Sequence, residues 1–136
     1  MGAWRCERGS TGPFIMILLP ALVGLVGLAY DGGLLFAGRR EANNVAAAAA
    51  RAGTNDLDEP SIYAGEPIMA SSAPGTAESF AFAQGVDTAS AYRVDDTLLE
   101  VEVTMQVELE FLGIVGLGTQ TVTGEASSRV QPGVDG

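Results

Sequence analysis

The feature that most constrains this chain is an uncharged, mostly apolar run of eighteen residues near its N-terminus, PFIMILLPALVGLVGLAY at positions 13–30. At about 1.5 Å per residue, eighteen to twenty helical residues span roughly 30 Å, the hydrocarbon thickness of a bilayer. Ser10 and Thr11 are residue types that cap helix N-termini, and Pro13 suits a first helical turn, where its missing N–H is not needed. The run therefore predicts a membrane-spanning helix, with the lipid bilayer as its partner.

A cleaved signal peptide and a buried helix of a soluble protein are the two alternatives for this run. A signal peptide has an apolar core of about 7–15 residues before a small-residue cleavage site, whereas this run is longer and leads into Asp31-Gly32-Gly33. A buried helix would need a larger domain around it than the remaining residues can build. A retained anchor is the preferred interpretation. Its orientation stays open on charge alone, because two Arg precede the run and two follow it.

The helical pattern continues past the membrane segment as far as Gly53. Small and apolar residues recur on one face at Gly38, Ala42, Val45, Ala49 and Ala52, and Arg40, Asn44, Ala47 and Arg51 lie on another. The Ala-rich sequence favours helix, and Gly53 suits the position after a helix end. We therefore predict one helix over residues 13–53, whose outer half is an amphipathic, Ala-rich extension.

Three small residues repeat at four-residue intervals where this helix would leave the membrane. Ala29, Gly33 and Ala37 have the small-xxx-small spacing that allows membrane helices to approach closely. They are the candidate residues for helix packing against other subunits.

Charge divides the chain into a slightly basic front and an acidic back. Residues 1–55 carry five Arg and three acids, a net charge of +2, and residues 56–136 carry two Arg and fourteen acids, a net charge of −12, which together give the −10 of the whole chain. A chain this acidic offers no broad basic face, so we expect no nucleic-acid partner.

The residue inventory excludes several chemistries. The chain has no Lys, no His and a single Cys, Cys6, which is expected to be an unmodified thiol. Ser-His-Asp relays, zinc sites with His and Cys ligands, and reactions that need a phosphate-binding or Schiff-base Lys are therefore excluded. We expect a non-enzymatic protein with no catalytic residues, no cofactor and no metal.

Residues 54–75 are rich in turn-forming types and predict a loop. The acidic cluster at Asp56, Asp58 and Glu59 lacks the spacing of an EF-hand, which favours a solvated loop over a cation site. Residues 76–84 predict a short helix with Phe80 turned inward.

Strict alternation marks a strand over residues 99–111, where apolar and polar residues alternate at all thirteen positions. One buried face and one solvent-exposed face are typical of an antiparallel sheet. Residues 91–94 are the expected upstream hairpin partner, with a turn at Asp95-Asp96, and residues 119–130 are a second, weaker strand. The solvent-exposed face carries Glu100, Glu102, Glu108 and Glu110. The predicted fold class is α+β, with a long membrane-spanning helix that continues into a small antiparallel sheet domain.

The segment FLGIVGLG at positions 111–118 joins the two strands and contains three glycines. It is not a nucleotide-binding loop, because the glycine spacing is wrong, no Lys follows, and strands flank it on both sides. An exposed apolar turn of this kind is expected to contact the membrane surface or a partner.

The most distinctive sequence lies in the membrane half: LLPALVGLVGLAYDGG at positions 18–33, then RREANN, then AAAAARAG at positions 46–53. With the strand pair joined by FLGIVGLGTQTVTGEASSRV, it resembles the TadE/TadG-like proteins of tight-adherence (Tad) pilus-assembly loci, in their actinobacterial form. The resemblance covers roughly residues 9–53 and 76–131. It implies a pilin-like fold, other Tad pilus-assembly or pilin-like subunits as partners, and a single-pass protein of the cell membrane with its N-terminus inside.

The residue patterns, together with the topology that this resemblance implies, give the expected organisation of the chain. Residues 1–12 are a short cytoplasmic N-terminus, 13–53 the membrane helix with its extension, 54–75 a loop, 76–131 an extracytoplasmic α+β domain and 132–136 a flexible tail.

One departure from the family pattern concerns processing. Pilin-like proteins are often cleaved by a prepilin peptidase after a Gly, with a Glu five residues on. Gly9 and Ser10 stand at the expected place and form the candidate processing site, but the fifth residue on is Phe14. This departure favours a subunit that stays in the membrane as an assembly factor.

The sequence thus predicts a membrane-anchored, minor-pilin-like assembly protein of a Tad-type secretion or adhesion system. The alternative is a membrane-tethered extracytoplasmic binding or sensory module that uses its acidic sheet.

Overall fold

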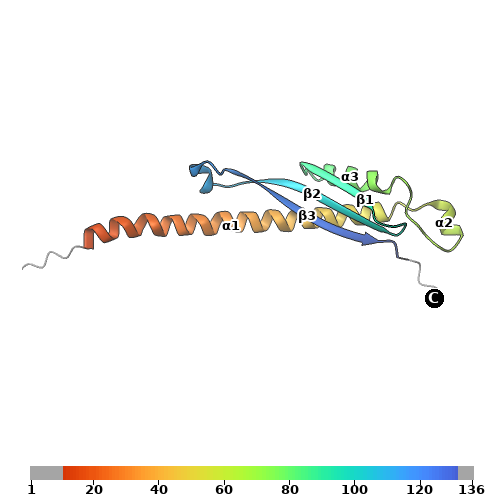
Figure 1. Cartoon of the computed structure of the whole chain (residues 1–136), viewed down its shortest axis with the longest axis horizontal. Coiled ribbons are helices and arrows are strands. Elements are labelled where there is room, and N and C mark those ends of the chain that lie inside the picture. Colours follow the sequence, from red (N-terminus) through yellow and green to blue (C-terminus); the bar gives the residue numbers. More distant parts are fainter. Residues whose placement is uncertain (1–10, 132–136) are drawn as a thin grey trace, which may run out of the picture.

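The computed structural model describes residues 11–131 of the chain, and its dominant element is the 44-residue helix α1 (Thr11–Thr54). At about 1.5 Å per residue α1 is roughly 66 Å long, and Pro20 lies within it. The N-terminal half of α1 projects as a bare rod, and the rest of the chain packs along its C-terminal half (Figure 1). The predicted continuous helix is confirmed, and it begins at Thr11, inside the segment expected to precede it. The other residues of that segment and the predicted tail, 132–136, lie outside the described residues.

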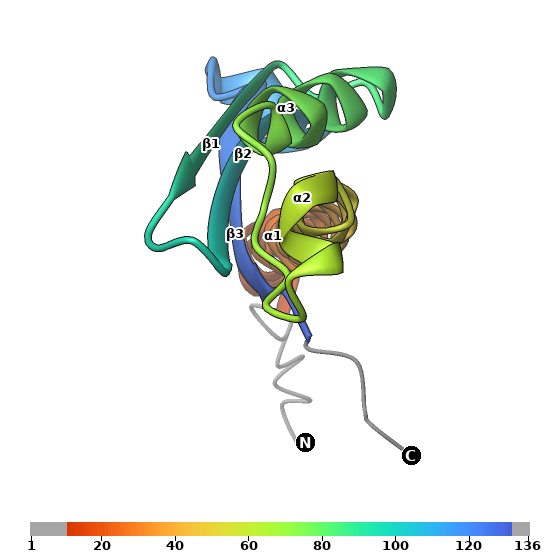
Figure 2. The same cartoon turned by 90° about the vertical axis from the view of Figure 1, so that its right-hand side faces the viewer.

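The remaining elements follow in the order α2 (Glu59–Tyr63), α3 (Ala73–Ala83), β1 (Thr88–Arg93), β2 (Leu98–Glu108), the 3₁₀ helix η1 (Leu112–Val115) and β3 (Thr119–Arg129). The strands form an antiparallel sheet in the order β1-β2-β3. In the end-on view α1 and α3 lie on the same side of the sheet (Figure 2). The α+β fold is confirmed.

The alternation of β2 places its apolar face on the helices. Leu99, Val101 and Val103 are completely buried, and Glu102 on the other face is exposed. The ladder ends at Glu108, three residues before the predicted strand end at 111. The Leu109 N–H still donates to the carbonyl oxygen of Gly118, but the next three N–H groups, those of residues 110–112, bond to α1 instead of to β3.

Small residues allow α1 and β3 to pack with their backbones nearly in contact. Ala42, Ala46 and Ala49 are completely buried in this interface. Opposite them lies Gly124, where an added Cβ would collide with backbone atoms of Ala42 and Asn43. The Ala-rich face predicted from the helical spacing is therefore the face that packs on the sheet.

The position of Phe80 differs from the prediction. Helix α3 begins at Ala73, earlier than expected, and buries Ala73, Ala77 and Ala81, while Phe80 is 36% exposed. A Cβ added to Gly53 of α1 would lie 2.8 Å from the carbonyl oxygen of Ala73. Because α1 and α3 approach this closely, the inward positions admit only small side chains.

The connection over residues 54–75 was predicted as a loop, and this is wrong in part, because it contains α2 and the start of α3. Its carboxylates serve as local hydrogen-bond acceptors. Asp58 caps α2 by accepting from the Ser61 N–H at 3.3 Å. Asp56 accepts from the Ser72 and Thr76 hydroxyls at 2.7 and 2.8 Å, which holds the start of α3 against the connection.

The hydrogen bonds at Asp56 predict a pH effect. The bond from Ser72, and then the bond from Thr76, lower the pKa of Asp56 below its ordinary 3.8. Because the pKa is lower in the folded than in the unfolded state, this contribution to stability is present above the unfolded pKa and is lost as the pH falls through the folded pKa. A carbon-13 NMR titration of the full chain in detergent micelles should place the Asp56 midpoint below 3.8.

In the double variant Ser72→Ala/Thr76→Val this midpoint should rise towards 3.8. Asp95 serves as the control, because its pKa is lowered chiefly by a backbone hydrogen bond from Thr97 and should stay low in the variant. An Asp56 that titrates at its ordinary value in the unmodified protein would show that these hydroxyls do not bind it in solution.

Candidate functional site

The uncovered N-terminal half of α1 is the first component of the candidate site. Every residue from 12 to 26 is exposed, although most are large and apolar. The helix is long and apolar enough to cross a membrane, and only 6% of its most apolar window is buried. The core helix of a soluble protein would be mostly buried, so the buried-helix interpretation does not fit this structure. The exposed surface is consistent with single-pass membrane anchoring.

The second component is the segment between β2 and β3, residues 109–118, here called the strand tip. It lies over the middle of α1, where the uncovered half of the helix begins (Figure 1). Phe111 packs on α1: a Cβ at Gly27 would lie 2.5 Å from its ring, and its ring centroid is 6.0 Å from that of Tyr30 in an edge-on arrangement. Gly116, at φ 89°, closes η1 in a left-handed conformation that favours glycine.

Asp31 fastens the strand tip to the helix. Its side chain is completely buried. One carboxylate oxygen accepts hydrogen bonds from the N–H groups of Glu110 and Phe111 at 3.1 and 3.3 Å, and the other accepts from the N–H of Leu112 at 2.7 Å. These N–H groups lie where the chain leaves the ladder and enters η1, so they have no strand or helix partner. We call this arrangement the Asp31 latch.

Sequence reasoning treated Asp31 only as the end of the apolar run. Its partners lie 79, 80 and 81 residues away in the sequence, beyond the reach of any periodicity argument. The available signal was an acid placed directly after a membrane-length apolar run, since ionisable residues at such positions need partners.

The predicted packing residues lie on another face of α1. Ala29, Gly33 and Ala37 are all exposed, and a Cβ at Gly33 would meet nothing within 4 Å. At 3.6 residues per turn they lie roughly opposite Asp31 around the helix. The sheet domain therefore leaves this face of α1 open. The candidate processing site, Gly9 and Ser10, lies outside the described residues.

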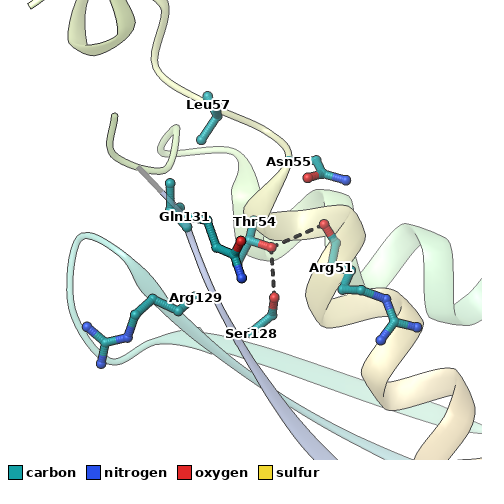
Figure 3. A pocket seen from close by; sticks show the side chains of 8 residues that line it. Arg51, Thr54, Asn55, Leu57, Ser128, Arg129 and Gln131 are labelled. Atoms are coloured by element: carbon teal, nitrogen blue, oxygen red, sulfur yellow. Dashed lines mark hydrogen bonds between the residues drawn. The ribbon is translucent and has the colours of Figure 1, made fainter. Parts of the chain in front are cut away.

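A polar hollow of about 310 Å³ lies at the other end of α1 (Figure 3). At its centre the Thr54 hydroxyl donates to the carbonyl oxygen of Arg51 at 3.2 Å and is bonded to the Ser128 hydroxyl at 3.0 Å. On its rim, a guanidinium nitrogen of Arg129 lies 3.9 Å from a carboxylate oxygen of Asp95. None of its eight lining residues is an acid, so the hollow is not an extension of the acidic face. Its hydrogen bonds join the end of α1 to β3.

The outer face of the sheet concentrates negative charge. Glu102 and Glu125 are direct cross-strand partners, an arrangement that is unfavourable for like charges. The charge of Glu100 is the main cause that raises the pKa of Tyr92, next to it on β1. Within residues 11–131, no three acids, His or Cys are grouped so that they could hold a metal ion.

Comparisons with known proteins identify the helical part of the chain. Residues 9–64 match the model of the family described as "Putative Flp pilus-assembly TadE/G-like". A comparison with curated proteins found no match, and a comparison with solved structures found none. The matched residues cover α1 with its exposed apolar surface, the Asp31 latch position and the Ala-rich packing face, and they end before the sheet. Residues 9–64, and with them the membrane-type helix of this protein, are thus similar to the TadE/G-like Flp pilus-assembly family.

Proposed function

We propose that this protein is a membrane-anchored pilus-assembly or minor-pilin-like subunit of a Tad-type secretion or adhesion system. It acts without catalysis, through contacts between its helix and other subunits. The observation that carries this proposal is the division of α1 into two halves. In the first half, residues 12–26 are all exposed and mostly apolar, and the second half packs on the chain's own sheet.

The proposed orientation places the N-terminus inside the cell and the sheet domain outside. The family resemblance is the basis for this orientation, and the acidic surface of the domain supports it, because fourteen acids in residues 56–136 suit an aqueous rather than a lipid environment. A cleaved signal peptide is disfavoured, because cleavage after the apolar run would separate Gly27 and Tyr30 from the Phe111 side chain that packs on them.

The face with Ala29, Gly33 and Ala37 is the proposed contact with a neighbouring subunit. These residues are exposed, so larger side chains there do not disturb the sheet domain. At a close helix–helix contact the same side chains would prevent the backbones from approaching. We therefore expect the variants Ala29→Leu, Gly33→Leu and Ala37→Leu to remain folded and to lose most surface pili.

The test is to delete the gene, image the cells for surface pili, and restore the gene with each variant. Ala21→Leu is the matched control, since Ala21 is equally exposed on α1 but lies well outside this face. Unchanged piliation in the deletion strain would contradict the assembly role. Full piliation with all three variants, in a strain that needs the gene, would contradict the proposed contact face.

The alternative function, a tethered binding or sensory module, is supported by the negative charge of the outer sheet face, where Glu102 and Glu125 are direct cross-strand partners. The same charge raises the pKa of Tyr92, with Glu100 as the main cause. A cation or basic ligand held there would lower the pKa of Tyr92 towards 10.0. The assembly role expects no such effect, so an NMR titration of Tyr92 with and without Ca²⁺ separates the two functions.

A further inference from the structure

We propose that the strand tip, residues 109–118, inserts into the outer leaflet of the bilayer that α1 spans, as a second membrane contact of this protein. The proposal rests on the membrane anchoring of α1 and does not depend on the role in pilus assembly. Its first support is the surface of the tip. Residues 111–118 carry no charge, and Ile114, Val115 and Leu117 are 83%, 71% and 54% exposed. An apolar group of this kind on a turn marks a contact site.

The position of the tip identifies lipid as its occupant. Phe111 packs on Gly27 and Tyr30, which are the last turn of the uncharged run. A span of about 20 residues that begins near Gly12 ends close to Asp31, so the tip lies at the outer edge of the hydrocarbon. Tyr30 is of the aromatic type that is enriched at this boundary. If the membrane boundary is placed later, at Arg39, the tip lies about 12 Å deeper in the bilayer.

The apolar surface of the tip is continuous with that of the anchor. Leu22, Val23 and Val26 of α1 and Phe111 of the tip together line a hollow of about 220 Å³, and all four residues are apolar. Lipid that surrounds the uncovered half of α1 would also fill this hollow and reach the exposed side chains of η1. Charged side chains lie only at the strand side of this apolar surface, at Glu110 within the tip and at Glu108 just before it, and both are exposed.

The Asp31 latch lowers the free-energy cost of placing the backbone of the tip in lipid. In lipid, an unpaired backbone N–H or a lone carboxylate is costly, because no water replaces the missing partner. Here the carboxylate of Asp31 and the three N–H groups that enter the tip satisfy one another. The N–H groups of Leu109, Ile114, Gly116 and Leu117 donate to carbonyl oxygens of residues 118, 111, 113 and 112. The tip thus meets lipid with most of its backbone donors already paired.

The test measures the depth of the tip with a tryptophan reporter. The full chain, in a Trp4→Phe background, is reconstituted in phosphatidylcholine vesicles whose acyl chains carry bromine near the headgroup or near the bilayer centre. The reporter variant is Ile114→Trp. Leu19→Trp, on the uncovered half of α1, controls for anchoring, and Val94→Trp, exposed at the other end of the sheet, controls for the aqueous domain.

We expect Ile114→Trp to lose fluorescence with shallow bromine and to emit at shorter wavelength than Val94→Trp, which should be unaffected. Unquenched Ile114→Trp beside a quenched Leu19→Trp would overturn the insertion and leave the anchor intact. If neither reporter is quenched, the anchoring fails as well. Ile114→Trp fluorescence that bromine does not quench, but that changes when the protein is diluted in lipid, would show that a second copy covers the tip. This result too would overturn the proposal.

Discussion

The variant Gly124→Ala is expected to lose about 3 kcal/mol of unfolding free energy or more, because a single added methyl group has no space at this position. Its Cβ would overlap the carbonyl carbon and oxygen of Ala42 and the nitrogen of Asn43. Backbone atoms of a continuous helix cannot move aside as a flexible side chain can. The sheet must therefore shift away from α1 over the buried alanines, which reduces the packing of the core.

The expected loss of stability comes from steric overlap with α1 and not from the backbone conformation of residue 124. Gly124 is not among the glycines with positive φ, so alanine fits its backbone dihedrals. The matched control is Gly75→Ala in α3, where the same methyl group meets nothing within 4 Å. Since Gly to Ala in a helix usually stabilises by about 0.4–1 kcal/mol, the control should be unchanged or slightly more stable.

Urea denaturation of the full chain in detergent micelles, followed by circular dichroism, measures both variants. A midpoint for Gly124→Ala that equals that of the unmodified protein would show that α1 and β3 are further apart than in this structure. Such a result would contradict the close backbone contact that explains why this face of α1 is rich in Ala.

The variant Asp31→Ala is expected to release the strand tip while the rest of the sheet domain stays folded. Three N–H groups, those of Glu110, Phe111 and Leu112, lose their acceptor. A buried N–H without a partner costs about 1–3 kcal/mol, but the tip can detach and avoid part of this cost. The expected effect is thus local, about a 100-fold loss of hydrogen-exchange protection at these three amides.

Two further variants separate the latch from a general effect of charge. Glu41→Ala removes the same charge from an exposed position on α1 and should leave the tip amides protected. Asp31→Asn keeps an oxygen acceptor but presents an amide N–H₂ group to one of the donors, so its effect should be intermediate. Tip amides that stay fully protected in Asp31→Ala would contradict the latch.

The sequence predicted those parts of the site that depend on local pattern. The uncharged run of residues 13–30 predicted a membrane-type helix, and the spacing of Ala42, Val45 and Ala49 identified its packing face. Both signals are repeats along one chain segment, and such repeats reflect the geometry of a single helix. The apolar composition of the tip between the strands could also be read from the sequence. Its position beside Gly27 could not.

The prediction for Phe80 shows why the remaining features needed the tertiary structure. Its size suggested burial, yet α3 packs so closely on Gly53 that only alanines face inward. Helix periodicity defines which residues share a face, but the distance between two helices decides which of those faces is buried.

The sequence by itself determined the elements of this protein: a helix long enough to cross a membrane, an alternating strand, and an acidic domain without Lys or His. Only the tertiary structure separated its small residues into two groups. Gly27, Gly38 and Ala42 contact the chain's own sheet and tip, while Ala29, Gly33 and Ala37 stay open for a neighbour. By side-chain size the two groups are alike. What distinguishes them is contact with residues about 80 positions away, a property of packing that no local repeat contains.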